Sequence, residues 1–110
     1  MYLPLFWERF IYVMRIIAKK TLKSFWLRYP DAEEPLLAWY HEVKHEAWAG
    51  PAAVKAKYGN ASIVGNNRVV FNIRGNRYRL VVAIHYRSGI VLIRFLGTHA
   101  EYDEIDVEEI

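Results

Sequence analysis

The chain has 110 residues, of which 54% are hydrophobic and 15% aromatic, and it contains no cysteine. This composition indicates one small globular domain rather than a disordered chain, and it excludes disulfides, thiolate catalysis and cysteine-ligated zinc. The net charge of +3 is unevenly spread: residues 1–100 hold all fifteen Lys and Arg with six acids, giving +9, whereas residues 101–110 hold six acids and no base, giving −6.

Residues 1–13 form an apolar stretch that Glu8 and Arg9 interrupt. The stretch is shorter than the roughly 18–20 apolar residues of a membrane span, and it lacks the basic start and small-residue cleavage site of a secretory signal. We therefore expect a cytoplasmic protein with no membrane partner. A methionine in frame at position 14 leads us to predict that residues 1–13 are an N-terminal extension and residues 14–110 the functional domain.

The first half of the domain is predicted to be mainly helical. A short strand over residues 15–18 precedes a helix over residues 19–29, whose apolar side chains recur at helical spacing. A break at Tyr29-Pro30-Asp31 follows, and the spacing of Asp31 and Glu34 resembles a capping box. The next helix is expected to end at Gly50-Pro51, and its tryptophans, like Trp26 in the helix before it, are expected in the core.

The second half is predicted to be mainly strands. A short helix over residues 51–58 leads into strands over residues 68–73, 78–86 and 90–96. Turn-forming Gly75-Asn76 and Arg87-Ser88-Gly89 separate the strands. The fold class is therefore α+β, with N-terminal helices packed on an antiparallel sheet that the first strand joins, and with a short C-terminal helix.

Arginines within the strands suggest contact with an anion. A basic body favours a partner such as nucleic acid, the alternative being charges that only solvate the surface. Arg79 alternates with Val81 on one face of its strand, and strict alternation groups Arg94 with Leu92 and Leu96. A guanidinium among aliphatic residues either grips phosphate or forms a salt bridge, here to a residue such as Glu46 or Asp103.

A histidine and a tyrosine follow the last predicted strand. Thr98 and Glu101 have capping-box spacing, which predicts a short helix with His99 and Tyr102 on one face. RNA supplies its own nucleophile, the 2′-hydroxyl, so cleavage needs proton transfer and charge stabilisation but no metal. His99 can move a proton near neutral pH, and Tyr102 can donate a proton or stack on a base; the alternative for His99 is an ordinary helix-start residue.

The remaining histidines are not expected to bind metal. His41 and His45 have the i, i+4 spacing of helical metal ligands, but the residues between them do not form the zinc-protease motif and acidic ligands are missing at suitable spacing. His85 is interpreted as an ordinary strand residue. We therefore expect no metal and no cofactor.

Several of these motifs together resemble the HigB toxin family of the RelE-like superfamily. They are Met14-Arg15-Ile16-Ile17, Ala53-Val54-Lys55 before Tyr58, Phe71-Asn72-Ile73 with Gly75-Asn76, Arg79-Leu80-Val81, Ile93-Arg94 and Thr98-His99-Ala100-Glu101-Tyr102-Asp103. The resemblance covers about residues 14–106. It implies a compact RelE-like fold and a toxin of a type II toxin–antitoxin pair, an endoribonuclease (mRNA interferase) that cleaves mRNA on the ribosome and is neutralised by a HigA-like helix-turn-helix antitoxin.

Six residues match the family's motif positions: Asn72, Asn76, Arg79, Arg94, His99 and Tyr102. We expect Arg79 and Arg94 to stabilise phosphate and transition-state charge, with His99 as acid or base and Tyr102 as acid or stacking platform. The predicted RNA-binding residues are Lys55, Lys57, Asn72, Arg74 and Asn76, although Gly75-Asn76 is also ordinary turn chemistry.

Two other interpretations fit the same sequence. One is a non-catalytic α+β module that binds RNA or protein, and the other is a partner domain whose basic face only docks an acidic antitoxin. Two roles are open for the acidic tail from Glu101 onward: it shapes the antitoxin contact, or it repels RNA.

Overall fold

The computed structural model describes residues 14–110; the predicted extension over residues 1–13 lies outside them, and the boundary at Met14 stays a prediction. The helices of this part are α2 (Lys19–Arg28), the 3-10 turn η1 (Pro30–Ala32), α3 (Glu33–Lys44), α4 (Pro51–Lys57) and α5 (His99–Tyr102). The strands are β1 (Arg15–Ile17), β2 (Ser62–Val64), β3 (Arg68–Ile73), β4 (Tyr78–His85) and β5 (Ile90–Thr98). The predicted α+β class is confirmed.

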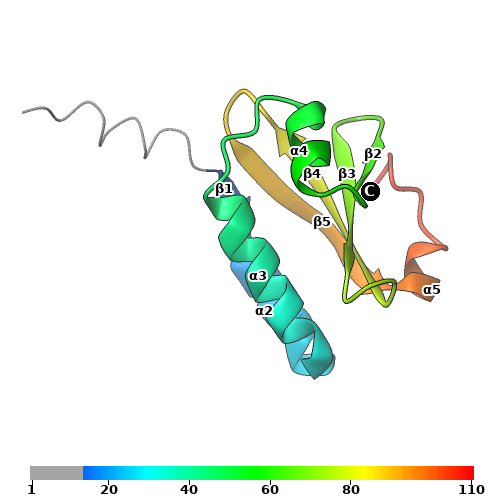
Figure 1. Cartoon of the computed structure of the whole chain (residues 1–110). Coiled ribbons are helices and arrows are strands. Elements are labelled where there is room, and N and C mark those ends of the chain that lie inside the picture. The colour runs from blue at the N-terminus through cyan, green and yellow to red at the C-terminus, as the bar shows by residue number, and fades with distance from the viewer. Residues whose placement is uncertain (1–13) are drawn as a thin grey trace, which may run out of the picture.

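The strands form one five-stranded sheet in the order β1-β5-β4-β3-β2 (Figure 1). The predicted antiparallel meander of β3, β4 and β5 is confirmed, with Ile73 opposite Tyr78 and Tyr78 opposite Thr98. The sheet as a whole is mixed, because β1 pairs in parallel with β5. The sequence analysis missed β2, a three-residue edge strand that pairs antiparallel with β3.

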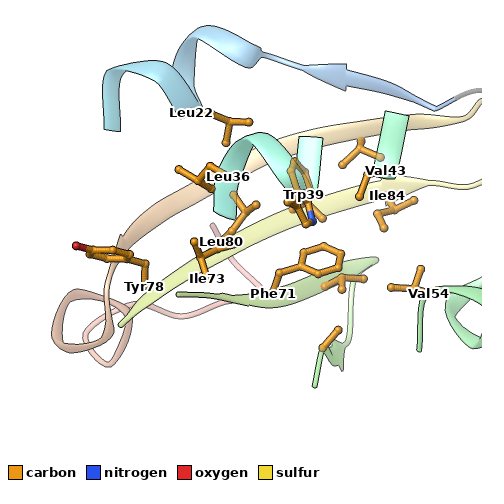
Figure 2. Packing of buried hydrophobic residues seen from close by; sticks show 14 of the residues in the cluster. Leu22, Leu36, Trp39, Val43, Val54, Phe71, Ile73, Tyr78, Leu80 and Ile84 are labelled. Carbon is orange, nitrogen blue, oxygen red and sulfur yellow. The ribbon is translucent and has the colours of Figure 1, made fainter. Parts of the chain in front are cut away.

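Helices α2 and α3 lie side by side against one face of the sheet and cover its apolar side chains (Figures 1 and 2). Leu22 and Leu36 from the helices and Leu80 from β4 are fully buried in this core. Burying a side chain of this size stabilises the fold by about 1.5–3 kcal/mol. The tryptophans predicted to lie in the core, Trp26, Trp39 and Trp48, are all buried. None of the helices in the described range has the length and apolar character needed to cross a bilayer.

Helix α3 differs from its prediction at both ends. The capping box was wrong: Ala32 occupies the N-cap position, no side chain caps the helix, and the Asp31 carboxylate binds Tyr78 and Arg77 instead. The helix also ends at Lys44 rather than near Gly50. Trp39 and Trp48 are nine residues apart, so a continuous helix would turn them to opposite sides, at about 100° per residue. Because α3 stops, both rings pack on Phe71, with centroids 5.4 and 6.4 Å from it.

A β-bulge in β5 places Arg94 and Leu96 on opposite faces of the sheet. Val81 is opposite Phe95 and Val82 is opposite Ile93, so Arg94 has no partner on β4. The extra residue interrupts strict alternation: the predicted grouping of Arg94 with Leu92 is confirmed, since Leu92 lies opposite the outer-facing Ala83, and the grouping with Leu96 was wrong. Leu96 packs against the core, whereas Arg94 is exposed on the opposite, outer face.

The outer face of the sheet is partly covered by residues 103–110, which we call the C-terminal segment. The segment runs from α5 back towards β2 and β3 (Figure 1). There the main-chain oxygen of Ile110 meets Arg68 and Arg94. Val81 and Ala83 are buried although they alternate with the core-facing residues of β4. The sheet is therefore shielded on both faces, by helices on one and by this segment on the other.

Candidate active site at helix α5

Helix α5 begins with the predicted capping box, which the structure confirms. The Glu101 main-chain nitrogen donates to Thr98 Oγ1 (3.2 Å), and the Thr98 nitrogen donates to Glu101 Oε1 (2.9 Å). Such reciprocal bonds satisfy two orphan donors of the first helical turn. Gly97 leaves room for them, because a Cβ there would lie 2.7 Å from Glu101 Oε1 and 2.6 Å from the Phe95 ring. The cap therefore fixes the point at which His99 leaves the sheet.

Arg79 and Tyr102 come together at this end of the sheet. The Arg79 guanidinium carbon lies 5.7 Å from the centre of the Tyr102 ring, within cation–π range. The guanidinium also donates to the main-chain oxygens of Asn76 (3.0 Å) and Tyr78 (3.3 Å). These acceptors lie in its own turn and strand, so the cation is held in place without a carboxylate partner among residues 14–110.

His99 is oriented by an acid that the sequence analysis did not assign to the site. Its Nδ1 lies 3.2 Å from Asp103 Oδ2, one helical turn on, and both side chains are at least half exposed. Because the carboxylate lies at Nδ1, Nε2 is the ring nitrogen left for a substrate, which suits an imidazole that exchanges protons. The i, i+4 spacing of His99 and Asp103 indicates this pair in the sequence, but the sequence also offered Asp103 as a salt-bridge partner for Arg94.

Arg94 lies apart from the other predicted catalytic residues. The bulge faces the Val81–Val82 step of β4, whereas Gly97 is opposite Arg79. At about 3.3 Å per residue, Arg94 is therefore roughly 10 Å along the sheet from Arg79. Neither predicted salt bridge of Arg94 forms, since Glu46 pairs with Lys57 and Asp103 with His99. Arg94 Nε donates instead to the main-chain oxygen of Ile110 (3.2 Å).

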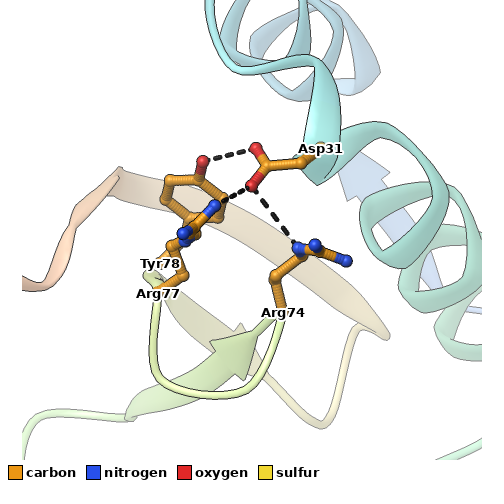
Figure 3. A network of polar contacts seen from close by, with 4 residues as sticks. All are labelled: Asp31, Arg74, Arg77 and Tyr78. Atoms are coloured by element: carbon orange, nitrogen blue, oxygen red, sulfur yellow. Dashed lines mark hydrogen bonds and ion pairs between the residues drawn. The ribbon is translucent and has the colours of Figure 1, made fainter.

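Asp31 joins the helical layer to the β3–β4 turn (Figure 3). Its carboxylate accepts from Tyr78 (2.5 Å) and Arg77 (2.5 Å) and lies 3.4 Å from Arg74 Nε. The hydrogen bonds from Tyr78 and Arg77 lower the pKa of Asp31. Burial, followed by the bond to Asp31, raises the pKa of Tyr78. Arg74, a predicted RNA-binding residue, thus forms an ion pair that holds the turn, while about half of its side chain stays exposed.

The remaining predicted RNA-binding residues have different surroundings. Lys55 Nζ donates to the Ala61 main-chain oxygen (2.6 Å), and Lys57 Nζ lies 3.5 Å from Glu46. Asn72 is exposed and opposite Arg79 on β3, so both lie on the outer face. Asn76 is exposed in the turn, where its main-chain oxygen binds Arg79. The asparagines therefore lie near Arg79, whereas both lysines already have partners within the chain.

A cavity of about 390 Å³ opens beside the unpaired end of β3. Its lining includes the rings of Trp39, Tyr58 and Phe71, with Lys57 and Asn72 among the polar groups. Tyr58 donates to Glu42 (2.5 Å), and burial, followed by this hydrogen bond, raises the pKa of the phenol. Asn72 lines this cavity and is also the strand partner of Arg79. The cavity is therefore close to Arg79.

Comparison with known proteins agrees with this architecture. Residues 32–105 match HigB_toxin, described as the RelE-like toxic component of a toxin-antitoxin system. The "mRNA interferase toxin HigB" of Escherichia coli (strain K12) and the "mRNA interferase HigB" of Shigella flexneri are each 29% identical over 92 residues, which cover 82% of this chain and 88% of the relative. The family match spans most of the chain, from η1 through the bulged strand to α5 and beyond, and the chain therefore belongs to the HigB_toxin family of RelE-like toxins.

Proposed function

We propose that this chain is an endoribonuclease that cleaves mRNA on the ribosome and so acts as the toxin of a type II toxin–antitoxin pair. The observation that carries the proposal is the cluster of Arg79, His99, Tyr102 and Asp103 at the exposed end of the sheet. Family membership and the names of the two relatives support it from a separate direction.

The cluster has the groups that metal-free RNA cleavage requires. The 2′-oxygen attacks phosphorus, the bond from phosphorus to the 5′-oxygen breaks, and a 2′,3′-cyclic phosphate and a 5′-hydroxyl are formed. One proton leaves the 2′-hydroxyl and one reaches the 5′-oxygen, and His99 Nε2 carries one of these transfers. Arg79 stabilises the negative charge that develops on the phosphate oxygens. With His99 as the base that accepts the 2′-proton, Tyr102 is the acid that donates a proton to the 5′-oxygen, and its ring also offers a surface on which a base can stack.

Substrate contacts extend from this cluster in two directions. Asn72 and Asn76 lie beside Arg79 and supply amide donors to the RNA backbone. At the cavity, the partly exposed ring of Tyr58 offers a surface on which a base can stack, whereas Trp39 and Phe71 are buried behind it. Lys57 at that cavity and Lys55 on the same helix contribute positive charge for phosphate or ribosomal RNA. Arg94 acts on a neighbouring phosphate rather than on the scissile one.

The proposed partner is a HigA-like antitoxin with a helix-turn-helix domain, and the proposed location is the cytoplasm, where translated messages are found. An adjacent reading frame that encodes such a protein, and its co-purification with this chain, would support the pairing. A toxin with no such neighbour and no antitoxin partner would contradict it.

The test of cleavage is primer extension on cellular messages after the chain is induced. We expect new 5′ ends at defined codon positions in the wild type and their loss in His99→Ala. The matched control is His85→Ala, which removes an exposed histidine from the other end of β4 and should keep both cleavage and growth arrest. Circular dichroism confirms that each variant is folded. Growth arrest without new 5′ ends would reject the nuclease and favour an RNA-binding module that does not cut.

A further inference from the structure

Two arginines on the outer face of the sheet converge on a single oxygen atom. Arg68 donates through Nε (3.1 Å) and Nη2, and Arg94 through Nε (3.2 Å), to the main-chain oxygen of Ile110. We call these residues the covered arginine pair. Two guanidinium groups aimed at one oxygen form the arrangement by which proteins bind a phosphate oxygen. The sequence analysis did not single out Arg68.

The arginine pair depends on local features of the backbone. Arg94 is the unpaired residue of the β5 bulge, which leaves it on the outer face with Leu92 while Leu96 turns towards the core. Arg68 is held from the opposite side, because its Nη1 donates to the main-chain oxygen of Asn66 in the preceding turn (2.9 Å). Asn66 and Asn67 adopt positive φ angles there. The donors are therefore positioned by the sheet and its turn as well as by the oxygen that they bind.

The C-terminal segment that covers the pair is attached mainly through its main chain. The Asn66 side chain donates to the Glu108 main-chain oxygen (2.9 Å), and the Glu108 carboxyl group lies against Gly65. Asp106, Glu108 and Glu109 form no ion pair within residues 14–110. Their negative charges therefore stay available to repel an approaching polyanion.

We propose that the covered arginine pair is a binding site for an RNA phosphate and that the C-terminal segment competes with RNA for it. The segment supplies the oxygen when RNA is absent, and RNA displaces the segment when it binds. This inference rests on the proposed function only in taking RNA as the ligand. It assigns the acidic tail to the control of RNA binding.

Binding is measured by fluorescence anisotropy with a labelled 12-nucleotide single-stranded RNA, on the full chain carrying His99→Ala so that the RNA stays intact. Removal of residues 106–110 should tighten binding by about tenfold and steepen its dependence on salt by roughly 0.7 log unit per added phosphate contact. Asp106→Asn with Glu108→Gln and Glu109→Gln keeps the main-chain contacts, so it should tighten binding less. This triple variant also tests the proposal if the truncated chain fails to fold.

Arg68→Ala tests whether the pair binds RNA or only anchors the segment. In the truncated chain it should remove most of the gain in affinity, and in the full chain it should change affinity little, because the site is already occupied. Arg87→Ala, which removes an exposed arginine from the β4–β5 turn, controls for the loss of one charge and should have the same small effect in both. Equal losses from Arg68→Ala in the two chains would contradict competition.

Hydrogen exchange gives an independent measurement. Addition of the RNA should raise amide exchange in residues 106–110 of the full chain, and unchanged exchange at saturating RNA would overturn the proposal. All of these measurements use a variant that cannot cleave. If the nuclease proposal is wrong, the wild type will produce no new 5′ ends. If this inference is wrong, neither the truncation nor the triple Asn/Gln variant will change RNA affinity.

Discussion

The arginines at the two ends of the outer sheet face have different bonding partners. At the α5 end, Arg79 lies against Tyr102 and is bonded only to main-chain oxygens of its own turn and strand, beside a half-exposed His99. Roughly 10 Å along the strands, Arg68 and Arg94 share an oxygen of the C-terminal segment. One end is open to a substrate, and the other is occupied by the chain itself.

The difference shows that positive charge in a sequence is not the same as positive charge available to a ligand. Arg74 and Arg77 make the point again, because both face the Asp31 carboxylate. Of the arginines between positions 68 and 94, Arg79 lies against Tyr102, and several others bind acids or main-chain oxygens. Substitutions at the two ends should therefore have unequal effects.

The largest effect is expected from Arg79→Ala compared with Arg94→Ala. Loss of a group that stabilises developing charge should lower the rate of message cleavage about 100-fold or more. Arg94→Ala should lower it far less, because Arg94 is occupied by the C-terminal segment until RNA displaces that segment. Cleavage rates in a reconstituted translation reaction, at several concentrations of toxin, separate the two. Equal losses in rate at saturation would show that both ends act on the same phosphate.

Among small substitutions at the α5 end of the sheet, Gly97→Ala should lower the stability of the fold most. The added Cβ would meet the Phe95 ring and Glu101, whose side chain closes the α5 cap, and overpacking of this kind costs about 1–3 kcal/mol. Denaturant unfolding measures the loss. Gly59→Ala is the matched control, because nothing lies within 4 Å of a Cβ there. A Gly97→Ala protein as stable as the control would show that the cap can shift without cost.

Thr98→Ala should remove one half of the capping box and leave Glu101 to bind the N-cap nitrogen alone. Loss of an N-cap side chain costs about 1 kcal/mol, here confined to the short helix that carries His99. Amide exchange in residues 99–102 should rise, and cleavage should fall with it. Thr98→Ser keeps the hydroxyl and should behave like the wild type. If Thr98→Ala cleaves normally, the cap does not position His99.

The smallest effect is expected from Asp31→Asn, and it should depend on pH. The folded-state pKa of Asp31 is lowered, so its stabilising contribution is present above the unfolded pKa of about 3.9 and is lost as pH falls through the folded pKa. The variant should be less stable than the wild type at pH 7, and the difference should shrink below about pH 4. Thermal unfolding across this range measures it. A difference that stays constant with pH would mean that the ionised carboxylate is not what stabilises the turn.

Local patterns in the sequence were enough to predict much of this molecule. Period-two alternation with Gly-Asn and Ser-Gly turns located the meander of β3, β4 and β5, and helical spacing located α2. The spacing of Thr98 and Glu101 predicted α5 and its cap. These features depend on residues a few positions apart, which a single sequence displays directly.

Which charged groups remain free depends on contacts between segments that are far apart in the chain. Asp31 was assigned to a nearby helix cap but binds Tyr78, 47 residues away, and Arg68 meets an oxygen 42 residues away. The bulge at Arg94 arises from the pairing of two strands, and alternation within one strand cannot reveal it. Hydrogen bonds and ion pairs between distant segments are set by how the layers pack. For that reason local sequence patterns predicted most of the elements and the candidate residues, and the packing determined which of those residues are exposed and which are paired.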